Sequence, residues 1–152
     1  MKQIKDSADK ILYDLGLFDE LKNYGVPHMI GSYTMDVMSH NDLDIVVSNE
    51  NMNIEKLYDI TKYIINKYHP SWYEAKQEKT DEGKTVWFHG FEATINNESW
   101  NFDIWFFDND IIKNTENFCN RIKCQLDDDP TKRNTIIQIK KSLIERNMYS
   151  FD

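Results

Sequence analysis

Two aspartates stand two positions apart in an apolar run, Asp42-Leu43-Asp44-Ile45, of the kind that is typical of a β-strand. Because side chains alternate between the two faces of a strand, both carboxylates project from the same face. Two carboxylates held so close repel each other unless a cation lies between them, and hard oxygen ligands suit Mg²⁺. The pair therefore predicts a divalent-metal site.

A Gly-Ser pair, Gly31 and Ser32, precedes these acids, with nine residues between Ser32 and Asp42. The pair follows a short apolar segment, 28–30, that reads as another strand. Glycine lets the backbone approach a ligand closely, and a helix that begins at Ser32 would present N–H groups to a phosphate. We therefore expect a phosphate-binding turn next to the metal site.

A third acid, Asp103, lies in the middle of the run 100–107, whose residues are mostly aromatic and apolar. Such a run is typical of a strand. A charge inside it is costly to bury unless it is paired or ligates a metal. Asp103 is therefore expected to be paired or to ligate a metal, whereas Asp108 and Asp110 follow the run and look like residues that begin a helix.

These residues together resemble the signature of the nucleotidyltransferase superfamily, which has the polymerase-β-like fold. The resemblance implies that Asp42, Asp44 and Asp103 are catalytic and bind two Mg²⁺ ions, or Mn²⁺. It implies that Gly31 and Ser32 bind the nucleotide. It also implies that Asp103 takes the proton from an attacking hydroxyl group.

The function implied by this resemblance is metal-dependent transfer of a nucleoside monophosphate from a nucleoside triphosphate, such as ATP, to a hydroxyl group. The acceptor would be a small molecule or a protein. Residues 33–41 contain no lysine or arginine to hold a triphosphate. Either Lys76, Lys79 or Lys84 provides that cation, or the metal alone holds the triphosphate.

Two other interpretations stay open. The first is a catalytically inactive member of the superfamily that binds nucleotide or a partner protein, which would account for the missing basic residues in 33–41. The second is an ordinary α+β domain in which the three carboxylates never meet.

Length and charge narrow the class of protein. A chain of 152 residues predicts one domain, 1–152, with a single core. The formal charge of −8 opposes binding to the phosphates of nucleic acid, so a nucleic-acid acceptor is disfavoured. We find neither a signal peptide nor an apolar run that could span a membrane, and we interpret the two cysteines, Cys119 and Cys124, as reduced thiols. These features predict a cytoplasmic protein.

Hydrophobic periodicity predicts an α+β fold with a mixed β-sheet, flanking helices and two C-terminal helices. The resemblance implies that this sheet is nucleotidyltransferase-like. The core would occupy about 26–107 and the C-terminal helices about 110–148. These two helices would hold the acceptor, or a partner chain would, either as a homodimer or as a second protein. In chain order we expect a helix over 4–21, strands over 28–30 and 42–47, a helix over 54–68, strands over 72–79, 85–95 and 100–107, and helices over 110–124 and from 130.

Several further residues have an ordinary structural interpretation beside a functional one. His40 and Ser39 either contact a phosphate or belong to a solvated turn. Aromatic side chains in the strands either stack on a base or pack as cross-strand pairs, the second being the more frequent arrangement; they are Trp87, Trp100 and Trp105. Basic residues of the last helix are assigned to its solvent-exposed face, namely Lys132, Arg133, Lys140 and Lys141.

Overall fold

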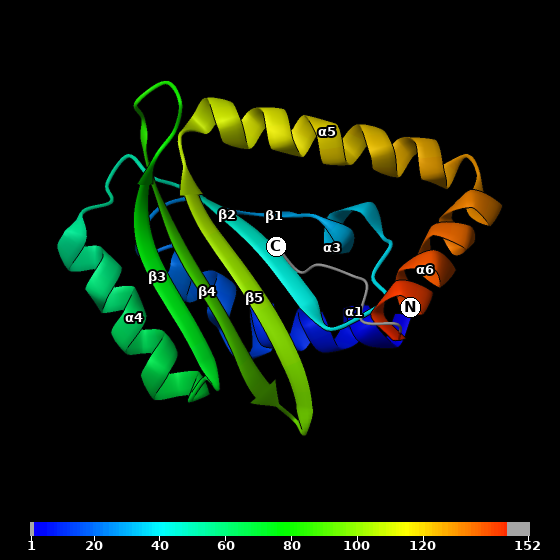
Figure 1. Ribbon diagram of the computed structural model, residues 1–152, viewed down its shortest axis with the longest axis horizontal. Coiled ribbons are helices and arrows are strands. Elements are labelled where there is room, and N and C mark those ends of the chain that lie inside the picture. The colour runs from blue at the N-terminus through cyan, green and yellow to red at the C-terminus, as the bar shows by residue number, and fades with distance from the viewer. Residues whose placement is uncertain (1, 146–152) are drawn as a thin grey trace.

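The computed structural model describes residues 2–145 and contains a five-stranded mixed sheet in the order β1-β2-β5-β4-β3 (Figure 1). The strands are β1 Pro27–Ile30, β2 Asp42–Ser48, β3 Trp72–Lys79, β4 Thr85–Ile95 and β5 Glu98–Phe107. The helices are α1 Lys2–Asp9, the π-helical turn η1 Lys10–Asp14, α2 Leu17–Leu21, α3 Ser32–Met35, α4 Ile54–Tyr68, α5 Asn109–Asp127 and α6 Pro130–Glu145. The predicted α+β class with a mixed sheet and two C-terminal helices is confirmed.

Strand β5 lies next to β2 and runs parallel to it, while every other neighbouring pair is antiparallel. Alternation along β5 explains its place at the centre of the sheet. Trp100, Phe102, Ile104 and Phe106 are buried on one face, whereas the residues between them face the other way and are partly exposed. The interior strand therefore has one apolar face and one face that carries Asp103.

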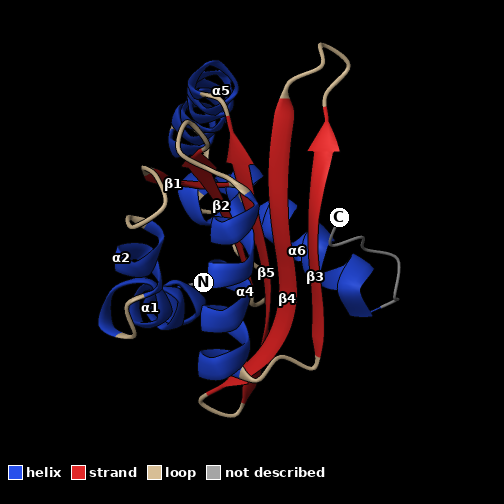
Figure 2. Ribbon diagram, turned by 90° about the vertical axis from the view of Figure 1, so that its left-hand side faces the viewer, coloured by secondary structure: helices blue, strands red, loops and turns tan. Residues whose placement is uncertain are grey.

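The apolar face of the sheet is covered by helices. Figure 2 shows α1, α2 and α4 together on one side of strands β3, β4 and β5. Ala8 and Leu12 from the N-terminal segment and Ile60 and Ile64 from α4 join the buried cluster formed by the strands. Burial of such side chains contributes about 1.5–3 kcal/mol each, so this layer is the main source of stability.

Helices α5 and α6 build a second, smaller core away from the sheet. Figure 1 shows α5 crossing one end of the sheet and α6 turning back from its far end. Val37, which follows α3, packs there against Leu126 of α5 and Ile137 of α6. This small cluster attaches the last helix to the segment between β1 and β2.

The predicted single helix over 4–21 is wrong in one respect, because the chain breaks at Gly16. Gly16 has a φ of +86°, in the left-handed region that glycine tolerates, and it separates η1 from α2. Leu15, counted with the apolar face in the periodicity, is 39% exposed as a result. The periodicity described the apolar positions on either side but not the change of direction between them.

The remaining boundaries lie close to the predicted ones. The β4–β5 hairpin turns at Asn96 and Asn97, which both have positive φ, so the turn is tighter than the predicted 96–99 connection. Helix α5 is longer than predicted and begins at its cap, Asp108, whose side chain accepts from the Ile111 N–H. The predicted end of the last helix, 146–148, lies outside the described residues.

Two simple properties complete the fold. Cys119 and Cys124 form no disulfide, as predicted. Among residues 2–145, the helices are all too short or too polar to cross a membrane.

A polar network is buried in the helix-covered side of the sheet. His89 of β4 is completely buried, and its Nδ1 lies 2.5 Å from the Tyr73 hydroxyl, which in turn lies 2.8 Å from Thr61 Oγ1. Burial lowers the pKa of His89 to about 4. The imidazole is therefore neutral in the folded protein throughout the neutral and mildly acidic range.

We expect acid to destabilise the protein through His89. Its side chain takes up a proton below about pH 6.5 in the unfolded chain but only near pH 4 in the folded one. The contribution of His89 to the free energy of unfolding therefore falls as the pH drops through that window, by about 3 kcal/mol in full. Urea unfolding of the wild type and of His89→Gln, which cannot titrate, isolates this contribution between pH 7 and 4, because the other titrating groups are common to both proteins. The wild type should lose about 3 kcal/mol relative to the variant over this range, and a difference that does not change with pH would contradict the assignment.

Candidate active site

The three predicted carboxylates lie on adjacent strands of the sheet. Asp44 of β2 is the direct cross-strand partner of Asp103 of β5, and Asp42 lies one step further along the same face of β2. Leu43 and Ile45, which alternate with them, are completely buried on the opposite face. The parallel pairing of two distant segments thus places all three acids in one group.

The Gly31–Ser32 turn lies directly against this group. β1 pairs with β2 so that Ile30 lies opposite Asp44, and Gly31 follows with a φ of +73°. A Cβ atom at Gly31 would lie only 2.5 Å from Asp44 Oδ2. Only glycine therefore allows the turn to approach the carboxylate so closely, and α3 begins immediately afterwards at Ser32.

Burial and the neighbouring carboxylates together change the protonation of Asp44. Burial, and then the charges of Asp42 and Asp103, raise the pKa of Asp44 to about 8. At neutral pH the proton on Asp44 relieves the repulsion. A divalent cation at the same place would relieve it equally and would displace that proton.

Lys140 of α6 is the principal site residue that sequence analysis assigned wrongly. It is only partly exposed, and its ammonium donates to Ser32 Oγ at 2.7 Å and to the Val37 carbonyl at 3.1 Å. Burial lowers the pKa of Lys140, while the charges of Asp42 and Asp44 act in the opposite sense. Lys140 therefore brings a positive charge to the predicted phosphate turn, from a position 108 residues away in sequence.

Arg133 holds α6 in the position that Lys140 requires. Its guanidinium is largely buried, donates to the carbonyls of Met35 and Lys123, and pairs with Asp127 at 2.7 Å. The predicted solvent-exposed face of the last helix is thus wrong for Arg133 and Lys140, whereas Lys132 and Lys141 are exposed. Arg133 and Lys140 instead point towards α3 and the connector after it, and both donate hydrogen bonds there.

His40 and Ser39 form a short chain of hydrogen bonds that ends at Asp42. His40 Nε2 lies 3.0 Å from Asp42 Oδ2, and His40 Nδ1 lies 3.1 Å from Ser39 Oγ. The His40 side chain is only 12% exposed, so it is not the solvated turn residue that we considered. It orients one oxygen of Asp42 and leaves the other for a different partner.

The donor set fits a hard divalent cation, although it is not preassembled around one. Asp42 Oδ1 is buried and has no hydrogen-bond partner within the described chain. Carboxylates on neighbouring strands are the ligand type that Mg²⁺ prefers. In residues 2–145, however, no group of three or more His, Cys, Asp or Glu side chains is arranged to hold a metal ion as it stands. Mg²⁺ commonly takes only one or two carboxylates and completes its coordination with water and phosphate oxygens.

The other candidate cations lie elsewhere. Lys84 pairs with Asp108 at 2.7 Å, and Lys79 donates to Thr85, both at the opposite end of β4 from its turn into β5. Lys76 pairs with Glu78 on β3. None of these interactions involves the Gly31–Ser32 turn, and the cation found there is Lys140.

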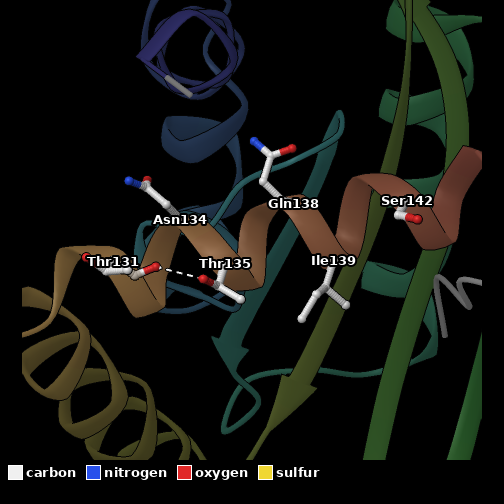
Figure 3. Close-up of a pocket in the computed structure, with 6 residues that line it drawn as sticks. All are labelled: Thr131, Asn134, Thr135, Gln138, Ile139 and Ser142. Carbon is white, nitrogen blue, oxygen red and sulfur yellow. Dashed lines mark hydrogen bonds between the residues drawn. The ribbon is translucent and has the colours of Figure 1, made fainter.

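A hollow on α6 is not part of this site. Figure 3 shows that all the residues that line it come from one face of that helix, and that none is charged. The three carboxylates are absent from its lining, which consists of Thr131, Asn134, Thr135, Gln138, Ile139 and Ser142.

The chain has a polymerase-β-like nucleotidyltransferase fold. Comparison with solved structures finds the Cid1 poly(U) polymerase, in a crystal structure with Mg and 3′-dATP bound, at a TM-score of 0.57 and 17% sequence identity. The match covers 91% of this chain and 41% of that one, so this chain spans well under half the length of the polymerase. No protein-family model and no curated protein matches the sequence.

Gly31→Ala should destabilise the protein more than Gly83→Ala. Both glycines have positive φ, but a Cβ at Gly83 meets nothing within 4 Å. We expect a loss of about 1 kcal/mol for Gly83→Ala from backbone strain alone, and about 2–4 kcal/mol for Gly31→Ala because the new methyl also collides with Asp44. Denaturant unfolding measures both losses. Equal losses would mean that the turn does not contact Asp44.

Proposed function

We propose that this protein is a metal-dependent nucleotidyltransferase that moves a nucleoside monophosphate from a nucleoside triphosphate to a hydroxyl acceptor. The observation that carries the proposal is the direct pairing of Asp44 with Asp103 on adjacent strands, against the Gly31–Ser32 turn. The polymerase with the same fold, solved with Mg and 3′-dATP bound, supports the same class of reaction here.

The residues divide the reaction between them. Gly31, Ser32 and Lys140 would bind the β- and γ-phosphates, because they provide backbone, hydroxyl and ammonium groups at one place. Asp42, Asp44 and Asp103 would hold Mg²⁺ or Mn²⁺, which supplies charge neutralisation at the phosphates when bound. His40 would keep Asp42 oriented.

The chemical step is an in-line displacement at the α-phosphorus. The acceptor oxygen forms a bond to that phosphorus while the bond to the bridging oxygen breaks, and pyrophosphate leaves. Asp103 accepts the proton of the acceptor hydroxyl. The protein contributes chiefly by positioning the reactants and balancing their charge.

A second candidate is a nucleotide-binding protein that does not catalyse transfer. It is favoured by the absence of a preassembled metal site in residues 2–145 and by the presence of the Lys140 charge beside Asp42 and Asp44. Nucleotide binding without any transfer product would select this alternative. Absence of nucleotide binding as well would reject both.

Asp44→Asn and Asp103→Asn should each abolish transfer. The assay follows label from α-³²P nucleoside triphosphates in the presence of Mg²⁺ and mixtures of hydroxyl acceptors. We expect a loss of about a hundredfold or more for each variant. Asp59→Asn, on the exposed side of α4, is the matched control and should retain full activity.

The same Asp44 variant separates function from folding. Burial and the acidic neighbours raise the pKa of Asp44, which means that a charged carboxylate at this position destabilises the fold. Replacing Asp44 with the neutral isostere Asn should therefore increase the thermal unfolding midpoint while activity is lost. Transfer that survives Asp44→Asn would contradict the mechanism. A lower unfolding midpoint would contradict the electrostatic account of the site.

Lys140→Met should weaken binding of ATP by about tenfold and leave binding of AMP nearly unchanged. The reason is that the ammonium at Ser32 would contact the β- and γ-phosphates, which AMP lacks. Isothermal titration calorimetry with Mg²⁺ measures both affinities. Lys141→Met removes the same charge from an exposed neighbour and should affect neither nucleotide. Equal effects of the two variants on ATP would rule out a specific role for Lys140.

A further inference from the structure

A pocket of about 300 Å³ opens on the far side of Asp103 from the Gly31–Ser32 turn. It lies on the face of β3, β4 and β5 that α1, α2 and α4 do not cover. Three aromatic side chains and three charged ones line it: Trp72, Phe88, Trp105, Glu74, Lys76 and Asp103. Because Asp103 belongs to both, the pocket adjoins the candidate active site.

The sheet register explains how the pocket is built. Glu74, Gly90 and Asp103 are cross-strand partners in one row across β3, β4 and β5. Gly90 contributes no side chain, and a Cβ there would lie 2.6 Å from the Phe88 ring and 3.2 Å from the Trp72 ring. The two rings therefore meet above Gly90. Glycine inside a strand often marks such a close approach.

Phe88, Trp105 and Phe107 form one cluster of aromatic rings. The Phe88 and Trp105 ring centroids lie 4.5 Å apart, and Trp105 stacks on Phe107 at 5.2 Å. Aromatic rings that line a pocket bind flat or apolar faces of ligands. Trp72, which is 46% exposed, forms the outer edge.

The charges in the lining favour a ligand that is not an anion. The Lys76 ammonium pairs with Glu78 at 2.8 Å and with Glu74 at 3.6 Å, and it also lies over the Phe88 ring. Its charge is therefore already compensated. The lining has two carboxylates, Glu74 and Asp103, for this one ammonium, and the whole chain has a net charge of −8. An anionic ligand would be repelled.

The geometry of in-line displacement indicates whether the nucleotide or the acceptor binds in this pocket. The attacking and departing oxygens must lie on opposite sides of the phosphorus atom. The phosphate turn with Lys140 lies on the β1–β2 side of the acids, so pyrophosphate would leave there. The attacking hydroxyl must then come from the β4–β3 side, where the pocket lies.

We propose that this pocket binds the acceptor, and that the acceptor is a small hydroxylated ring compound that is neutral or cationic. This inference rests on the proposed nucleotidyl transfer. The ring packs on Trp72, Phe88 and Trp105 while a hydroxyl group reaches Asp103. The pocket is small and acidic, which disfavours the phosphate-rich end of a nucleic acid.

The test uses two probes with the same hydroxylated ring and opposite charge, tyramine and 4-hydroxyphenylacetate. The full chain is labelled with 5-fluorotryptophan and titrated with each probe while ¹⁹F NMR spectra are recorded. The four tryptophans provide the internal control. Trp72 and Trp105 line the pocket, whereas Trp87 and Trp100 are buried on the opposite face. Trp→Phe variants at each position assign the four signals.

Tyramine should shift the Trp72 and Trp105 signals and leave the other two in place. It should bind about fivefold more tightly than 4-hydroxyphenylacetate, because the two carboxylates favour the ammonium. Trp105→Phe should weaken tyramine binding, as measured on the Trp72 signal. No shift at Trp72 and Trp105, equal shifts at all four tryptophans, or tighter binding of the anionic probe would each overturn the proposal.

Binding of ATP with Mg²⁺ is measured on the same sample by calorimetry. If ATP binds and tyramine does not shift the pocket signals, the acceptor inference fails alone. If tyramine shifts them but ATP does not bind, the proposed nucleotidyl transfer fails, and with it the assignment of the pocket to an acceptor.

Discussion

The central constraint on this structure is that three carboxyl groups lie close together in a partly buried site. Asp42, Asp44 and Asp103 come from two adjacent strands, and burial, together with the charges of the other two acids, raises the pKa of Asp44 to about 8. Such an arrangement is costly in a folded protein unless a cation or a proton compensates for it. The protein uses both: a proton on Asp44 near neutral pH, and the ammonium of Lys140 beside the turn. That cost is typical of a site kept for function and not for stability.

The rest of the fold can be understood as support for that arrangement. The buried face of the sheet, covered by α1, α2 and α4, holds β2 and β5 in register. The small cluster around Val37 and the Arg133 contacts hold α6 against the connector between α3 and β2. The first layer therefore positions the acids, and the second positions the compensating charge. On the far side of Asp103, aromatic residues of β3, β4 and β5 form the open pocket that we assign to the acceptor.

Local patterns predicted most of the elements because those elements depend on local interactions. The alternation of Asp42 and Asp44 with Leu43 and Ile45 placed both acids on one face, and the structure agrees. The apolar and aromatic neighbours of Asp103 likewise predicted the strand that contains it. The break at Gly16 was not, because an apolar periodicity continues on both sides of a change in chain direction. The roles of these residues in catalysis remain proposals that the described experiments decide.

The sequence alone was enough to predict the strand positions of the three acids, the turn at Gly31 and the α+β class. Each of these follows from side-chain alternation, residue type or spacing within a short segment. Only the tertiary structure decided which distant groups meet them. Lys140 is separated from Ser32 by 108 residues. Its spacing of four and three residues from Ile136 and Ile137 places it on the inward face of α6, unlike the exposed Lys141, but that spacing does not identify the group that lies opposite. His40 likewise needed the fold of its connector to reach Asp42. These contacts depend on how whole elements pack, and helical periodicity within one segment contains no information about the partner on which it packs.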